Sequence, residues 1–147
     1  MVLEASRTVE VDAPIERCYE LAADIERAPD WQETLLDVEV LERNDQRRPL
    51  LVETTNDVIV RKARTTVRFS YDPPNGLSWE QEEGDAKWMK GRWEFEDLGE
   101  GRTRATYALE SDPGRVLGML LRGPVQDRVK QHLTNAPAEG LERVAPE

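Results

Sequence analysis

The sequence predicts an α+β domain in which one antiparallel sheet of six or seven strands is covered by a long helix. Residues from about 35 to 112 form successive runs of alternating apolar and polar side chains separated by short turns, which is typical of antiparallel strands. After residue 113 the apolar residues recur every three or four positions, as on one face of a helix. A twisted sheet of this size curls, and a helix laid across it need not fill the hollow between the two layers.

The first quarter of the chain predicts a strand followed by helix. A short alternation from Leu3 to Val11 indicates the strand. Asp12 is expected to cap the helix that follows, and Pro14 suits its first turn, where a missing backbone N–H costs nothing. Pro29 ends the helical region. The predicted buried stripe of this helix consists of Ile15, Cys18, Tyr19, Ala22 and Ile25.

The remaining elements follow from alternation and from turn residues. The turns contain Asn44-Asp45-Gln46, Pro73-Pro74-Asn75-Gly76, Gly84 and Gly99-Glu100-Gly101. The closing helical region begins after Asp112-Pro113-Gly114, is broken at Gly123-Pro124, and is weakened near its end by Pro137 and Gly140. The predicted strands cover a run around Val38 and Val40, then 50–60 with a bend near Asn56-Asp57, 63–71, 77–82, 87–97 and 102–110.

Composition excludes several classes of partner. The 147 residues carry 20 Lys or Arg against 30 Asp or Glu, a formal charge of −10, so nucleic acids and anionic membranes are disfavoured. The single cysteine, Cys18, and the single histidine, His132, offer neither a disulfide nor a zinc site, and we expect no metal and no cofactor. The longest apolar stretch, 116–121, is far too short for stable membrane insertion, and no signal peptide is recognisable. We therefore expect a cytoplasmic protein with one domain over residues 1–147.

The alternation also predicts which side chains face the hollow. That face is mainly apolar with scattered hydroxyls and amides, as in pockets for small molecules, whereas Arg64 and Arg68 alternate to the outside. The alternative is that these residues simply fill a core. The expected ligand-binding residues on the strands are Thr54, Asn56, Val67, Phe69, Tyr71, Trp79, Gln81, Met89, Trp93, Phe95 and Tyr107, and those on the closing helices are Leu121, Val125 and Val129.

Two stretches of the chain resemble a known family. The segment VDAPIERCYELAADIERAPDWQ (residues 11–32) and the later GDAKWMKGRWEFEDLGEGRTRATY (84–107) are similar in order and spacing to the polyketide cyclase/dehydrase group of the START-like, Bet v 1-like superfamily. The resemblance implies the helix-grip fold, a seven-stranded antiparallel sheet around a long C-terminal helix. It also implies a deep cavity for lipids, polyketides, quinones or similar apolar molecules. Trp31 would then either gate one end of the cavity or anchor its loop on the sheet.

Two functions remain open from the sequence. The first is a binding module for a small hydrophobic molecule, which we prefer; the second is an aromatase/cyclase or dehydratase that acts on a polyketide-like chain in the same cavity. No catalytic constellation matches residue by residue, so the candidates for proton transfer are only Tyr71, Tyr107 and His132. The segment 114–123, with its glycines and leucines, forms either a lid over the pocket or the contact of a homodimer.

Overall fold

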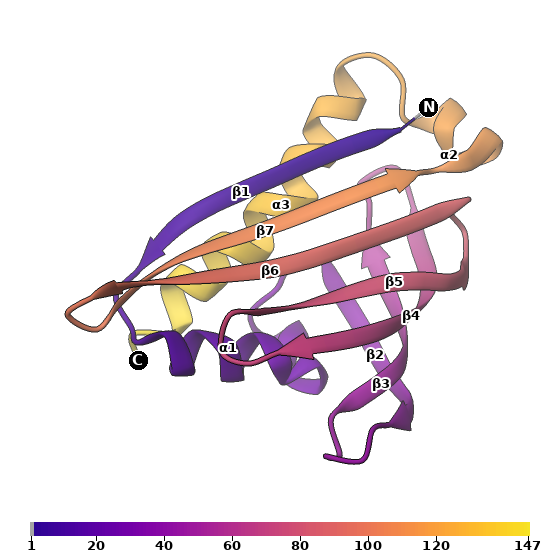
Figure 1. The fold of residues 1–147 in the computed structure, drawn as a ribbon. Coiled ribbons are helices and arrows are strands. Elements are labelled where there is room, and N and C mark those ends of the chain that lie inside the picture. The colour runs from indigo at the N-terminus through magenta and orange to yellow at the C-terminus, as the bar shows by residue number, and fades with distance from the viewer. Residues whose placement is uncertain (1) are drawn as a thin grey trace.

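The computed structural model describes residues 2–147 and contains one seven-stranded sheet with helices against one of its faces (Figure 1). The strands lie in the order β1-β7-β6-β5-β4-β3-β2, and every neighbouring pair is antiparallel. The strands are β1 (Leu3–Val11), β2 (Leu35–Arg43), β3 (Pro49–Asp57), β4 (Lys62–Asp72), β5 (Gly76–Gly84), β6 (Trp88–Gly99) and β7 (Arg102–Asp112). The helices are α1 (Ile15–Ala23), the 3₁₀ helix η1 (Ile25–Asp30), α2 (Gly114–Leu120) and α3 (Pro124–Val144).

The predicted order of elements is confirmed, including the meander from β2 to β7. Strand ends lie within a few residues of the expected positions, and the first strand matches throughout. The region expected over 50–60 with a bend near Asn56-Asp57 forms strand only as far as Asp57, where the chain turns. The Asp57 side chain itself makes that turn, because its Oδ1 accepts the backbone N–H of Ile59 at 2.8 Å.

The expected cap of the first helix is wrong. Asp12 lies too early in the chain, because α1 begins at Ile15 and Pro14 occupies the capping position without a side-chain hydrogen bond. The carbonyl of Pro14 accepts the backbone N–H groups of Arg17 and Cys18 instead. The predicted buried stripe of the helical region is confirmed, since Ile15, Cys18, Tyr19, Ala22 and Ile25 are all buried.

The final helix does not weaken where the sequence predicts it. Helix α3 runs without interruption through Pro137 and Gly140 to Val144. Both residues are buried against the rest of the protein, so tertiary packing offsets their poor helix propensity. The break predicted at Gly123-Pro124 is confirmed: α2 ends at Leu120, and Gly123 turns the chain with a φ of +65° before α3 begins.

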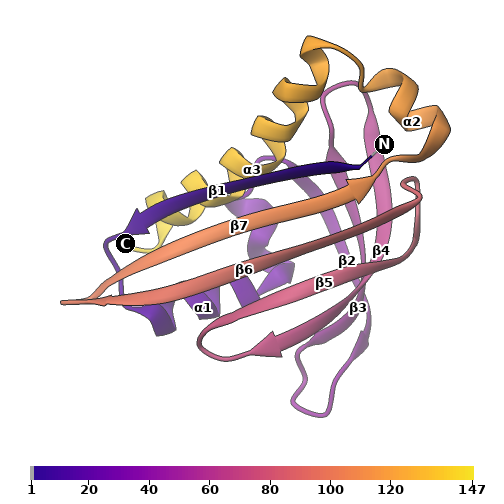
Figure 2. The same cartoon turned by 45° about the horizontal axis from the view of Figure 1, so that its top comes forward.

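Helix α3 runs along the inner face of the sheet beside β1 and β7, while α1 and η1 lie below it (Figures 1 and 2). The main core lies between these layers and combines residues of the sheet, α1 and the C-terminal half of α3. A second, smaller cluster joins Val58, Leu117, Leu121 and Val129 near the N-terminal end of α3. This division leaves space between the two clusters, and the candidate site lies there.

Candidate functional site

A cavity of about 170 Å³ lies between the inner face of the sheet and the helices. Its wall is mostly apolar. All seven strands contribute to it, β2 only through its first residue, together with α2 and the N-terminal half of α3. Eleven of the expected residues line it: Thr54, Asn56, Val67, Phe69, Trp79, Gln81, Met89, Trp93, Tyr107, Leu121 and Val129.

Four other expected residues lie outside the wall. Trp31 is buried in the main core, where its ring centroid lies 6.3 Å from that of Trp93. Phe95 stacks on Trp93 farther along β6, at a centroid distance of 5.7 Å. Val125 packs against the smaller apolar cluster. Tyr71 points toward the β2–β3 turn and donates its hydroxyl to the carbonyl of Pro49 at 2.7 Å.

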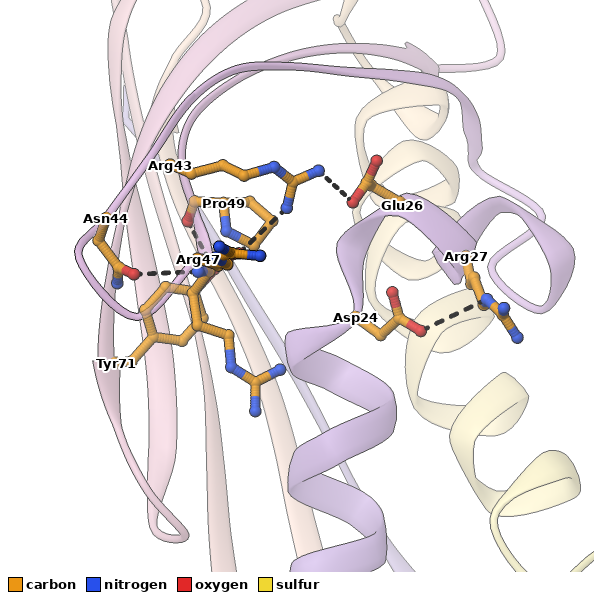
Figure 3. A network of polar contacts seen from close by, with 9 residues as sticks. Asp24, Glu26, Arg27, Arg43, Asn44, Arg47, Pro49 and Tyr71 are labelled. Carbon is orange, nitrogen blue, oxygen red and sulfur yellow. Dashed lines mark hydrogen bonds and ion pairs between the residues drawn. The ribbon is translucent and has the colours of Figure 1, made fainter.

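Tyr71 thus belongs to a polar network that fixes the β2–β3 hairpin against η1 (Figure 3). Arg43 crosses from the hairpin to Glu26, with 2.6 Å between Nη2 and Oε1, and also donates to the carbonyl of Arg47. These groups are largely exposed, so they position the hairpin more than they stabilise the protein.

His132 also lies outside the cavity wall. Its Nε2 is buried without a hydrogen bond and lies 3.7 Å from Oδ2 of Asp57, at the start of the β3–β4 turn. Its neighbours Lys130 and Leu133 do reach the cavity. The histidine therefore joins α3 to the β3–β4 turn.

Sequence reasoning missed several wall residues. Leu3 and Ala5 lie on the same face of β1 as the buried Val9, and this alternation was a usable signal. Gln32 and Thr34 line the cavity from the loop between η1 and β2, where no periodicity exists to place them.

The aromatic residues form one connected surface of the cavity. The centroid of the Trp79 ring lies 5.7 Å from that of Phe69 and 5.5 Å from that of Tyr107. The rings of Trp93 and Tyr107 meet edge-on, with their centroids 4.9 Å apart. Rings in such tilted contacts restrain one another and provide a rigid apolar wall. Gly91 of β6 lies opposite Trp79, and its missing side chain makes room for the indole.

Several polar groups of the wall already have partners within the protein. Gln81 accepts a hydrogen bond from Thr65 at 2.8 Å and donates to the carbonyl of Ala86 at 2.9 Å. Asn56 donates a hydrogen bond from Nδ2 to Oγ1 of Thr54 at 3.1 Å.

The Tyr107 hydroxyl has no such partner, and the side chains of Gln32 and Thr34 also make no hydrogen bond within the described residues. The hydroxyl oxygen of Tyr107 keeps accessible surface although the residue is buried. Because Tyr107 lines the cavity, that surface opens on its interior. Desolvation raises the pKa of Tyr107 well above its ordinary value of 10, so the group is a neutral hydrogen-bond donor near neutral pH.

All three tyrosines are expected to ionise late. Burial is the main cause that raises the pKa of Tyr19, Tyr71 and Tyr107 above 10. Each raised pKa therefore contributes stability that is present below pH 10 and is lost as the pH rises above it. In an alkaline titration followed by phenolate absorbance, the folded protein should lag behind the urea-unfolded chain. Superimposable curves would contradict the burial of these hydroxyls.

Comparison with known proteins places the chain in a family. Residues 11–137 match the family model described as polyketide cyclase/dehydrase and lipid transport, so the chain belongs to that family. No curated protein sequence matches significantly. The structure has the START-type helix-grip fold that the sequence resemblance implied.

Several solved structures share this fold. A START superfamily protein from Mycobacterium smegmatis is 21% identical, with a TM-score of 0.82 over 95% of this chain and 94% of its own. A protein from Thermus thermophilus is 25% identical, with a TM-score of 0.84 over 98% and 97%. The Zhui aromatase/cyclase from Streptomyces sp. R1128 is 21% identical, with a TM-score of 0.83 over 99% and 94%.

Proposed function

We propose that residues 1–147 act as one unit that binds a small, neutral, largely apolar ligand of the lipid, polyketide or quinone type in the cavity. The single observation that carries this proposal is an aromatic-lined cavity that contains unpartnered hydrogen-bond donors, among them the Tyr107 hydroxyl. Such a combination orients an apolar molecule through a few polar contacts. The eleven expected residues in the wall are the proposed ligand contacts.

Charge supports a neutral ligand. The protein carries a formal charge of −10, so an anion approaches against the overall field. Among the described residues that line the cavity, only Glu4, Arg64 and Lys130 carry a charge, and the Arg64 side chain is bound to Glu53 on the outside of the sheet.

We retain the cytoplasm as the expected compartment because the lone cysteine suits reducing conditions. No helix within residues 2–147 is long and apolar enough to cross a bilayer.

Aromatase/cyclase or dehydratase activity is the second candidate, favoured by the family and by the neutral, buried Tyr107 as a proton donor to a carbonyl oxygen. Binding is preferred because the cavity wall offers few side chains that could act as a general base. Within the described part of the chain, the cavity wall includes no histidine or cysteine, and its only carboxylate is Glu4 near the edge of the sheet.

Tyr107→Phe is the test of ligand orientation. We expect this variant to bind 1-tetralone, a neutral bicyclic ketone, about tenfold more weakly than the parent protein, because a hydrogen bond of about 1.4 kcal/mol is lost. Tetralin, which has the same ring system without the carbonyl, should bind equally to both. Displacement of the dye N-phenyl-1-naphthylamine measures both affinities.

Tyr71→Phe is the matched control, since Tyr71 donates to Pro49 outside the cavity. It should lower the free energy of unfolding by about 1 kcal/mol and leave the affinity for 1-tetralone unchanged. Tyr107→Phe should keep full stability, because its hydroxyl has no partner in the described residues. If the dye and both compounds fail to bind the parent protein, the binding proposal is wrong; conversion of a poly-β-ketone to an aromatic product would instead favour the second candidate.

A further inference from the structure

Exposed apolar side chains gather at one end of the molecule. On α2, Val116 is 70% exposed, Met119 60% and Leu120 45%; on the β3–β4 turn, Ile59 is 40% exposed and Val60 37%. We call these five residues the mouth patch. Soluble proteins rarely concentrate large apolar side chains on two short segments unless the surface meets a partner.

The two segments meet at one end of the cavity, which we take as its entrance. Val58, directly before the exposed tip of the turn, packs with Leu117, Leu121 and Val129. Val58, Leu117 and Leu121 also line the cavity, so the patch lies directly outside its wall. Figures 1 and 2 both show α2 at the end of the sheet where the N-terminus lies, and Figure 2 shows the β3–β4 turn rising beside it.

The two segments that carry the mouth patch have a formal charge opposite in sign to that of the whole protein, although Asp85 of the β5–β6 turn also lies here, 3.6 Å from Arg61. Residues 57–64 and 112–130 contain seven Lys or Arg against three Asp, a formal charge of +4, while the rest of the chain carries −14. Within the described residues, five of these cations have no ion pair: Lys62, Arg115, Arg122, Arg128 and Lys130.

The tip of the turn holds an apolar residue in an unfavourable conformation. Ile59 has a φ of +70°, in the left-handed region that β-branched residues avoid. The hydrogen bond from its N–H to Asp57 keeps this shape. The turn therefore presents an isoleucine to solvent at a position where glycine would be less strained.

We propose that the mouth patch docks on the surface of an anionic lipid bilayer, which brings the entrance of the cavity against the membrane. Exposed apolar residues flanked by unpaired Lys and Arg suit the boundary between acyl chains and anionic headgroups. A second copy of this chain fits less well, because a symmetric contact would place two positive patches face to face. The net charge of −10 had disfavoured such membranes, but the two segments that carry the mouth patch are themselves positive.

Vesicle sedimentation tests the proposal with the full chain. The protein should bind phosphatidylcholine vesicles that contain phosphatidylglycerol, and should bind pure phosphatidylcholine vesicles at least about tenfold more weakly. High salt should weaken the binding to the anionic vesicles. The double variant Val116→Gln/Met119→Gln and the variant Arg115→Gln/Arg122→Gln should each reduce it about tenfold.

Ile59→Gly separates docking from folding. It removes an exposed apolar side chain and relieves the left-handed backbone, so it should reduce vesicle binding without loss of stability. Leu41→Thr is the control, since Leu41 is 47% exposed on β2, outside the patch, and its loss should not change binding. Equal binding to both vesicle types, no binding at all, or a dimer that Val116→Gln/Met119→Gln dissociates would each overturn the proposal. None of these outcomes depends on ligand affinity in the cavity.

Discussion

Gly140→Ala is expected to lower the free energy of unfolding by about 2–3 kcal/mol, and the melting temperature by roughly 5–10 °C. A Cβ atom built on Gly140 would lie 2.2 Å from the carbonyl oxygen of Trp31. That oxygen belongs to backbone held by a hydrogen bond from Trp31 N–H to Ala28, so it cannot move aside like a flexible side chain. Thermal and urea unfolding followed by circular dichroism would measure the loss.

The intrinsic helix propensity of alanine predicts the opposite sign. In an open helix, replacement of glycine by alanine stabilises by about 1 kcal/mol. A gain of stability in Gly140→Ala would therefore contradict the close contact between α3 and the Trp31 loop. Glu139→Ala is the neighbouring control: Glu139 is exposed and its ion pair with Arg7, at 3.6 Å, should matter little.

Gly91→Ala should weaken binding of 1-tetralone by about tenfold or more, equivalent to about 1.4 kcal/mol. A Cβ atom on Gly91 would lie 2.5 Å from Cε2 and Cζ2 of the Trp79 indole. Because Trp79 lines the cavity beside Gly91, we expect the displaced indole to move into the cavity. The displaced ring would occupy space that the ligand needs.

A double-mutant cycle identifies the indole as the cause. In a Trp79→Leu background, the smaller side chain leaves room for the new methyl group, so Gly91→Ala should then have little effect on affinity. If Gly91→Ala weakens binding equally in both backgrounds, displacement of Trp79 is not the mechanism. A crystal structure of Gly91→Ala would show the position of the indole directly.

The sequence predicted the sheet well because alternation depends on the local chain alone. A strand with one buried face must place every second residue inward, and this rule located Val67, Trp79 and Tyr107 in the cavity wall. The same rule placed Tyr71 inward, but it could not predict the hydrogen bond from Tyr71 to the carbonyl of Pro49. That contact depends on the path of a distant hairpin.

Errors arose where contacts between distant segments override local preference. From its helix propensity, Gly140 is expected to weaken the helix. In the structure it allows α3 to approach the backbone of Trp31, which lies more than a hundred residues earlier in the chain. Asp12 has the chemistry of a cap but lies too far from Ile15 to act as one. Gln32 and Thr34 reach the cavity through a loop whose course no periodic pattern reveals.

The separation of the apolar residues into two clusters affects how the protein can open. Val58, Leu117, Leu121 and Val129 hold the entrance, while a much larger and independent set of residues holds the sheet to α1 and the C-terminal half of α3. Local opening requires only the contacts of the segment that moves, and its free energy is then lower than that of global unfolding. This end of the cavity can therefore open through a local fluctuation, while the rest of the protein remains folded.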